Sequence, residues 1–254
     1  MDCMTTVRHP LSRRRLLGGG ISLAAFALTG CVTSEERAAR EQALQARLRE
    51  FPAEPPLGAD AEIYASRVDD GFVLPTIPYE RIDPRFRRQI VPDPTGEPAD
   101  TVVVDIANHF LYFVRPDRQA VRYGVGLGRE GFAWSGRAIV EWKQHWPRWF
   151  PPEEMIARQP ELAKYKAVQI PGTNEWKGGQ PGGLDNPLGA RAMYLFQDGK
   201  DTLFRLHGSP EWASIGKSVS SGCVRLINQD VIDLYDRVPE KAPVLVTTEM
   251  PVVG

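Results

Sequence analysis

Residues 101–114, TVVVDIANHFLYFV, say the most about the fold of this chain. β-branched and aromatic residues, which favour strands, fill both halves of the stretch. Asn108 and His109 interrupt the apolar run and predict a hairpin turn between the two halves. The stretch therefore predicts two neighbouring strands of one sheet.

Further strand patterns and a few helical ones follow along the chain. A proline-marked loop with short helical turns is predicted over residues 147–165. A long loop rich in glycine and proline follows it. Apolar residues near a helical period predict a helix over 227–238, with Asn228 as its N-cap. Residues 100–250 are thus expected to form one mostly β domain with short helices. The remaining strand patterns cover 120–128, 136–146, 190–196, 202–208 and 243–248, and the two loops cover 147–165 and 171–187.

Residues 1–30 have the features of an export signal. Three arginines at 13–15 precede an apolar run over 16–28, which is shorter than the roughly 20 residues that span a bilayer. The arginines favour the twin-arginine route over the general export route. Leu-Thr-Gly-Cys, ending at Cys31, resembles a bacterial lipobox and predicts a lipid on that cysteine. The alternative is an ordinary signal-peptidase site with a chance cysteine.

Two segments lie between the expected lipid anchor and the domain, together residues 31–99. Residues 33–50 are good helix formers with few large apolar side chains, which predicts a solvated spacer helix. Residues 51–98 are rich in proline and predict an extended arm, partly packed and partly linker. Without residues 1–30 the chain keeps 27 basic and 31 acidic residues, so its charge indicates no nucleic-acid partner.

Cys223 is the only cysteine after Cys31. In an oxidising compartment such a thiol is either a buried bystander or a reactive group. A thiol becomes a good nucleophile when a histidine takes its proton, which leaves three candidates. His109 is expected at the surface of its turn, and His145, among aromatic residues, is expected to pack or to line a cleft. His207 ends a strand, so His207 and Cys223 are the expected pair.

The loop before Cys223 is built of small residues. Ser220, Ser221 and Gly222 allow a tight turn in which the N–H groups of Gly222 and Cys223 converge on one point. Such donors stabilise the oxyanion of an acyl-transfer intermediate. On these residues alone, a simple turn with a buried thiol remains the alternative.

A longer pattern contains these residues and resembles a known family. His-Gly at 207–208 is followed in order by Ile-Gly at 215–216, by Ser220, by Gly-Cys at 222–223 and by Arg225. This order resembles the L,D-transpeptidase family with the YkuD-type catalytic domain, as do the segments 125–128, 147–152 and 186–190. The resemblance covers about residues 100–248. It implies a mostly β fold of sandwich or barrel-like form.

The resemblance also implies catalytic roles. Cys223 would be the nucleophile, and His207 the base and then the acid. The Gly208 carbonyl would orient the imidazole, and Ser220 and Gly222 would shape the oxyanion pocket.

Three residues are expected on the substrate side of the site. Arg225 would pair with a substrate carboxylate, with a salt bridge to Asp230 or Asp233 of the next helix as the alternative. Trp149 and Ser221 are assigned to the same side. Ser221 stands where many members have a second histidine, which leaves His207 as the sole nearby base. Residues 134–137, WSGR, also depart from the threonine- and proline-containing turn that is common in the family.

The resulting expectation is a periplasmic enzyme anchored by lipid on Cys31, with the outer membrane favoured because Val32 follows the cysteine. It would act on tetrapeptide stems of peptidoglycan, without metal or cofactor, and would form 3-3 cross-links or attach an outer-membrane protein to the wall. Acylation by carbapenems would follow. The alternatives are a hydrolase that uses the same thioester, as an L,D-carboxypeptidase or endopeptidase, and a non-catalytic wall-binding lipoprotein.

Overall fold

The structure is a computed structural model that describes residues 57–128, 134–173, 176–220 and 223–250. The expected signal segment, Cys31 and the expected spacer helix lie outside these residues, as do Ser221 and Gly222. Within the described ranges, no helix is long and apolar enough to cross a membrane.

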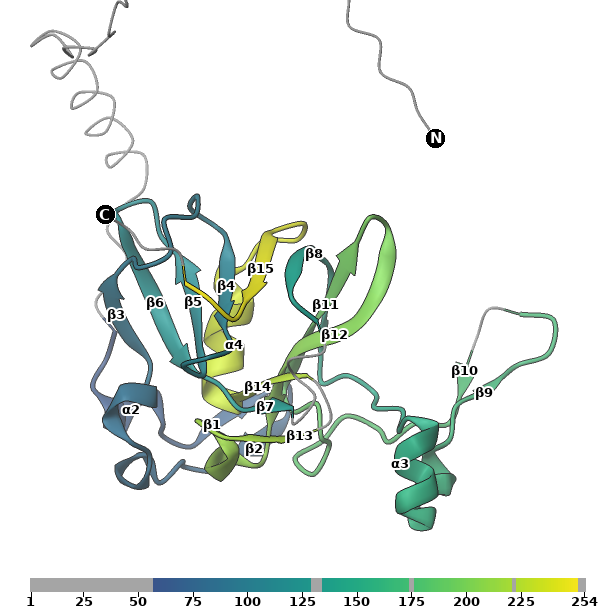
Figure 1. The fold of residues 1–254 in the computed structure, drawn as a ribbon. Coiled ribbons are helices and arrows are strands. Elements are labelled where there is room, and N and C mark those ends of the chain that lie inside the picture. Colours follow the sequence, from purple (N-terminus) through teal and green to yellow (C-terminus); the bar gives the residue numbers. More distant parts are fainter. Residues whose placement is uncertain (1–56, 129–133, 174–175, 221–222, 251–254) are drawn as a thin grey trace, which may run out of the picture. The chain divides into compact units, whose positions relative to one another are not determined.

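A nine-stranded sheet forms the centre of the fold (Figure 1). The two halves of residues 101–114 pair antiparallel, Val102 opposite Phe113, and His109 sits in the turn between them with a φ of 58°. The predicted hairpin is therefore confirmed. Two strand pairs are parallel, β12 with β14 and β15 with β4. Across the sheet the strands are β14 (Val224–Ile227), β12 (Lys200–Ser209), β11 (Arg191–Gln197), β8 (Gly136–His145), β15 (Pro243–Thr247), β4 (Val102–Asp105), β5 (Phe110–Val114), β6 (Gln119–Gly124) and β3 (Gln89–Pro92).

The main core lies between this sheet and helix α4 (Asn228–Arg237). Val231 and Leu234 of α4 are buried against apolar side chains of β11 and β12. The predicted N-cap is wrong, because Ile227 occupies the cap position and makes no side-chain cap. The side chain of Asn228 instead accepts a hydrogen bond from the backbone N–H of Ala190 at 2.9 Å.

The fold is sandwich-like and its sheet is not closed. A small parallel sheet pairs β7 (Leu127–Gly128) with β13 (Ser218–Ser220). Next to it, Gly126 and Arg225 exchange two backbone hydrogen bonds of 2.9 and 2.8 Å. The chain that continues β6 is thereby fixed to β14, the first strand of the large sheet. This arrangement holds the residues around Cys223 against the rest of the domain.

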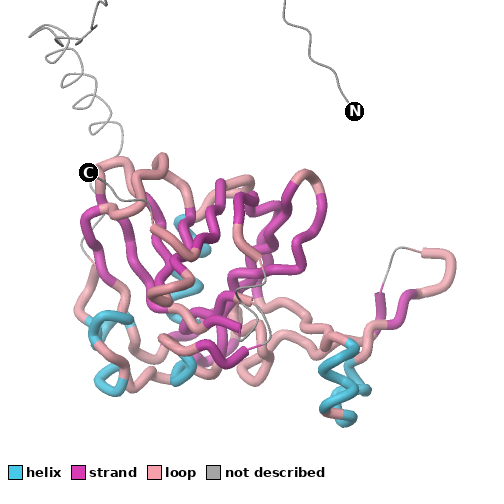
Figure 2. The backbone as a smooth tube through the Cα atoms, viewed as in Figure 1, coloured by secondary structure: helices cyan, strands magenta, loops and turns pink. Residues whose placement is uncertain are grey.

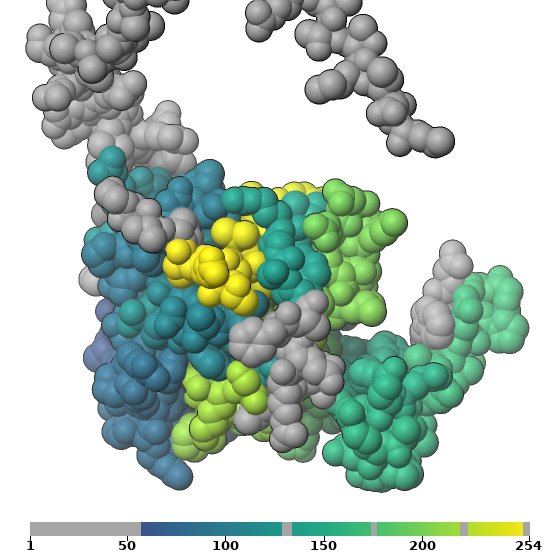
Figure 3. All heavy atoms as spheres, in the orientation of Figure 1, coloured from purple at the N-terminus to yellow at the C-terminus, as the bar shows by residue number. Residues whose placement is uncertain are grey.

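The described part of the proline-rich arm, residues 57–98, packs on the domain more fully than the sequence predicts. Its last strand, β3, forms the edge of the large sheet beyond β6. Tyr64 is fully buried, and Arg88 contacts two carboxylates of α4. In Figure 3 the atoms coloured blue pack directly against the atoms coloured teal. The arm contains α2 (Asp60–Ile63), β1 (Arg67–Asp69), β2 (Phe72–Leu74) and the 3-10 turns η1 (Tyr79–Arg81) and η2 (Pro84–Phe86).

Residues 147–182 form an excursion between β8 and β11 (Figure 2). The predicted helical turns are present as α3 (Glu153–Arg158) and η3 (Pro160–Tyr165). The strand β10 (Trp176–Lys177), inside the second predicted loop, pairs antiparallel with β9 (Val168–Gln169), which precedes that loop.

Candidate active site

His207 lies near the end of β12, between β11 and β14. Its Nδ1 is 2.6 Å from the carbonyl oxygen of Gly208. Because a carbonyl can only accept, Nδ1 carries the proton, and the lone pair is on Nε2. The pKa of His207 is lowered to about 4, mainly by burial and also by the cationic Arg225 and Arg205, against the opposing effect of the Gly208 carbonyl. The imidazole is therefore neutral at neutral pH and can accept a proton at Nε2.

Gly208 is required by close packing as well as by this hydrogen bond. A Cβ at this position would collide with the Asn228 side chain and would lie 2.9 Å from Val231. The same Asn228 side chain fills the space where Gly189, with a φ of 61°, would carry its Cβ. The start of α4 thus holds β12 in place next to His207. Any larger residue at position 208 would displace the imidazole.

Cys223 is placed by the register of the parallel strands β12 and β14. Leu206 pairs with Val224 and His207 with Arg225, so Cys223 is level with Arg205. Alternate residues of a strand share a face, and Leu206 and Val224 belong to the buried core. Cys223 and His207 therefore lie on the opposite face, Cys223 directly before β14 and His207 on the neighbouring β12.

Cys223 is half-buried, and its thiol lies near the guanidinium groups of Arg205 and Arg225. Its Sγ lies 4.0 Å from the carbonyl oxygen of Leu203. Burial raises the pKa of the thiol, whereas the backbone N–H of Arg205 and the guanidinium groups of Arg205 and Arg225 oppose this shift. The thiol is therefore protonated in the resting state and needs a base to become a nucleophile.

Arg225 binds a carboxylate, but not either of the two considered in the sequence analysis. Its guanidinium is 2.7 Å from a carboxylate oxygen of Glu211, whose side chain is 67% exposed. Asp230 and Asp233 face Arg88 of the arm, at 3.5 and 2.6 Å, so the expected alternative partners are wrong. An exposed partner leaves the guanidinium open to exchange with a carboxylate from solution.

The other residues singled out in the sequence are distributed more widely. Ser220 is the last residue of β13, and its backbone pairs with Gly128. Trp149 exchanges two backbone hydrogen bonds with Gln180 at the base of the 147–182 excursion. Ser221 and Gly222 lie outside the described residues.

The two remaining described histidines have other partners. His109 is half-buried, with Nε2 3.0 Å from the hydroxyl of Ser218. His145 lies 2.7 Å from a carboxylate oxygen of Asp70 and packs edge-on against Tyr235.

A row of side chains beside Cys223 was missed by the sequence analysis. Arg205 lies over the ring of Tyr194, and Tyr194 stacks on Trp142 with the ring centroids 3.6 Å apart. Arg205 also forms a two-pronged ion pair with Asp201, at 2.7 Å for each prong. The signal was the period of two in a strand, because Arg205 stands two residues before His207.

Comparison with known proteins identifies the domain that carries this site. The sequence model of the YkuD L,D-transpeptidase catalytic domain matches residues 99–246. The chain belongs to the L,D-transpeptidase family. Among curated relatives, the probable L,D-transpeptidase ErfK/SrfK of Escherichia coli is 33% identical over 54% of this chain and 41% of its own length. The probable L,D-transpeptidase YcfS of the same organism is 29% identical over 71% of this chain and 56% of its own length. The chain therefore spans about half the length of these relatives.

The solved structures that resemble this chain superpose on it with low TM-scores. An L,D-transpeptidase from Mycobacterium smegmatis is 18% identical, with a TM-score of 0.39, over 58% of each chain. A probable carnitine operon oxidoreductase from Brucella melitensis is 45% identical, with a TM-score of 0.43, over 64% of this chain and 94% of its own. Both TM-scores are below 0.5, so the fold is assigned from the strands of this chain and from the family match.

The described residues contain no group of three histidine, cysteine or acidic side chains that could hold a metal ion. The His207 face of the sheet presents the Cys223 thiol, the imidazole and the guanidinium groups of Arg205 and Arg225.

Proposed function

We propose that this member of the L,D-transpeptidase family is an active transpeptidase that uses Cys223 as its nucleophile. One observation carries the proposal. His207 is neutral because it is buried, and the Gly208 carbonyl fixes its proton on Nδ1. The imidazole lies on the same face of the sheet as the Cys223 thiol, on β12, and Cys223 directly precedes the adjacent β14. A histidine with a purely packing role would not need a fixed tautomer beside a thiol of raised pKa.

The reaction would begin with transfer of the Cys223 proton to Nε2 of His207. The thiolate attacks the carbonyl between the third-position diamino acid and the terminal D-alanine of a tetrapeptide stem. In the tetrahedral intermediate, the positive charges of Arg205 and Arg225 near Sγ favour the developing anion. The imidazolium then protonates the departing D-alanine amine, which leaves a thioester on Cys223.

The second half of the reaction resolves the thioester. An acceptor amine loses its proton to His207, attacks the thioester carbonyl and releases Cys223 as the thiol. If the amine belongs to another stem, the product is a 3-3 cross-link. If it belongs to an outer-membrane protein, that protein becomes attached to the wall.

The cellular setting is part of the same proposal. The export signal in residues 1–30 and the lipobox ending at Cys31 support a periplasmic enzyme that is lipid-anchored to a membrane, with the outer membrane favoured. The substrate would be peptidoglycan, and carbapenems would acylate Cys223.

The test is incubation with tetrapeptide muropeptides and mass spectrometry of the products, with Cys223→Ala as the control. Cross-linked dimers that lack one D-alanine are expected with the wild-type chain and not with the variant. Tripeptides alone would replace the proposal with the hydrolase alternative. An unchanged substrate would leave the non-catalytic wall-binding alternative, and dimers made by Cys223→Ala would overturn the role of the cysteine.

A further inference from the structure

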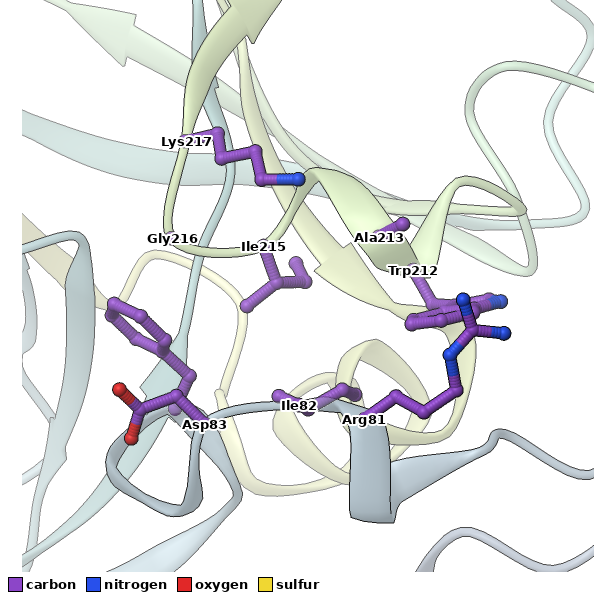
Figure 4. Close-up of a pocket in the computed structure, with 9 residues that line it drawn as sticks. Arg81, Ile82, Asp83, Trp212, Ala213, Ile215, Gly216 and Lys217 are labelled. Carbon is purple, nitrogen blue, oxygen red and sulfur yellow. The ribbon is translucent and has the colours of Figure 1, made fainter.

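A cavity of about 350 Å³ lies between the arm and the loop that leads from β12 to β13 (Figure 4). One wall comes from residues 81–86 and the other from residues 212–217, which include the 3-10 turn η4 (Trp212–Ser214). The side chains of Ile82 and Ile215, each nearly buried, supply its apolar part. Cavities of this size hold small polar ligands or parts of larger ones.

Two cationic side chains border the cavity. The Arg81 guanidinium lies over the Trp212 ring, 5.2 Å from its centroid, and Figure 4 shows Lys217 reaching over the cavity from the opposite wall. Both residues are exposed, and neither has an ion pair or hydrogen bond with any side chain in the described part of the chain. The one carboxylate in the lining, Asp83, is already paired with Arg85 at 3.3 Å. The cavity thus offers two unpaired positive charges beside an apolar floor.

The loop that forms one wall of the cavity is bonded to residues next to the active site. Glu211, which precedes Trp212, is the ion-pair partner of Arg225. The N–H of Gly216 donates to the Val125 carbonyl, and the Lys217 carbonyl accepts from the N–H of Leu127. The 211–217 loop is therefore fixed to the strands that flank Cys223.

The arm shapes this loop directly. Gly216 has a φ of 77°, and the Phe86 ring occupies the space that a Cβ at 216 would need. Residues 81–86 lie before residue 99, where the family match begins. One wall of the cavity is therefore a feature of this chain outside the matched catalytic domain.

Transfer between two stems requires a second binding place for the acceptor. The row of Arg205, Tyr194 and Trp142 lies beside the reacting thiol and shares no residue with the cavity. A stem peptide carries free carboxylates and aliphatic side chains, which match two unpaired cations beside an isoleucine floor.

We propose that this cavity binds the acceptor stem peptide through its carboxylates, with Arg81 and Lys217 as the recognising groups. The inference rests on the proposed transpeptidase function, because only that function requires an acceptor stem.

The test measures binding of a stem tripeptide to the full chain carrying Cys223→Ala. The tripeptide lacks the terminal D-alanine and so cannot act as a donor. Adding Arg81→Gln and Lys217→Gln is expected to weaken binding about tenfold to a hundredfold, since each charge-assisted hydrogen bond contributes roughly tenfold in affinity. The matched control is Arg118→Gln with Lys164→Gln, which removes the same two charges from exposed positions outside the cavity and should leave the dissociation constant within about twofold.

A second probe separates carboxylate recognition from general charge attraction. The tripeptide with its carboxyl groups amidated should bind weakly, and equally to the chains with and without the two cavity substitutions. Equal tripeptide affinity in those two chains would overturn the inference, and so would an equal loss in the matched control.

The proposed function is judged separately, by formation of cross-linked dimers from tetrapeptide muropeptides in the chain that retains Cys223. If no dimers form and yet the cavity substitutions weaken tripeptide binding, the transpeptidase proposal fails and the cavity remains a stem-peptide site. If dimers form while tripeptide binding does not depend on Arg81 and Lys217, the inference alone fails.

Discussion

The titration of His207 should be visible in the reactivity of the neighbouring Cys223 thiol. Burial lowers its pKa to about 4, so the base stays unprotonated down to that pH. We expect the rate of Cys223 alkylation by iodoacetamide to lose its histidine-dependent component only as the pH falls through about 4, rather than through the usual 6.5. Above neutrality the rate should rise toward the raised pKa of the thiol.

The control for this profile is His207→Ala, measured over the same pH range. Its alkylation should depend on thiol ionisation alone and lack the acid limb near pH 4. A wild-type acid limb at pH 6.5 would show that the imidazole is solvated and protonated, contrary to the buried position seen here.

Two of the described histidines can be compared by their effect on one reaction, the acylation of Cys223. His207→Ala should reduce acylation of Cys223 by a tetrapeptide donor by two to four orders of magnitude, the usual contribution of general acid–base catalysis. His145→Ala removes a contact with Asp70 and should change the acylation rate less than about threefold. Rapid-mixing mass spectrometry of the acyl-enzyme measures both, and equal losses in the two variants would refute the assignment of the base.

Among single residues, the sequence predicts those whose spacing is distinctive. It does not predict those whose position depends on how the strands pair. His207 and Cys223 stand out because His-Gly and Gly-Cys occur in a fixed order. Arg205 could be placed beside the thiol only when the parallel pairing of β12 and β14 was known. Glu211 as the partner of Arg225 depends on the path of a loop, which no local pattern encodes.

Between elements, the arm is joined to α4 by a buried charge cluster. Arg88, 8% exposed, lies between Asp230, which is fully buried, and Asp233. Burial raises the pKa of Asp230 to about 7, whereas Asp233, despite its own burial, has a pKa of about 2 because Arg237 and Arg88 bind it. The two carboxylates therefore affect stability in opposite directions as the pH changes.

Removing the cation should destabilise the fold in a pH-dependent way. At pH 8, Arg88→Met leaves Asp230 buried without its cation, so the carboxyl must either stay charged and unpaired or take up a proton, which costs about 3–5 kcal/mol of unfolding free energy. At pH 5 the cost should be smaller, because Asp230 is already protonated there in the wild type. Urea unfolding at the two pH values measures this, and an equal loss at both would show that the charge of Asp230 is not involved.

The sign of the Asp230 contribution gives the control. Its folded pKa is above the unfolded value of 3.8, so its contribution is fully present below about pH 4 and is lost as the pH rises through 7. Asp230→Asn should remove this loss. The unfolding free energy of that variant should thus fall less than that of the wild type between pH 4 and 8.

The strands and the arm differ in how far local sequence determines them. Residues 101–114 are strand-forming whatever their surroundings, and the structure makes them β4 and β5. The strand β3 ends at Pro92 in a proline-rich segment, and it forms because β6 offers an open edge on which such a short strand can pair. The Asn228 prediction failed similarly, since the side chain binds Ala190 of another element rather than its own helix end.

For the whole molecule, the boundary of the folded unit lies before the boundary of the family match. The match begins at residue 99, yet an apolar cluster joins the arm to the catalytic domain. Its buried members are Tyr64, Ile77, Ile82 and Phe86 from the arm and Ile215 and Ile227 from the domain. A chain cut at the family boundary would expose the two domain residues and leave β6 as an unprotected edge.

We therefore expect a chain of residues 57–254 to fold cooperatively, and a chain of residues 99–254 to aggregate or to unfold at much lower urea concentration. Each buried side chain of this size stabilises by about 1.5–3 kcal/mol, so the four arm residues together contribute about 6–12 kcal/mol, which is comparable with a typical unfolding free energy of about 5–15 kcal/mol. The shorter chain should consequently be only marginally stable rather than fully unfolded. Its strand structure should be detectable by circular dichroism, and its urea unfolding transition should be broad. Equal urea midpoints for the two chains would mean that the arm merely covers the domain. In that case the wall of the cavity at residues 81–86 could not be expected to hold its shape against the 212–217 loop.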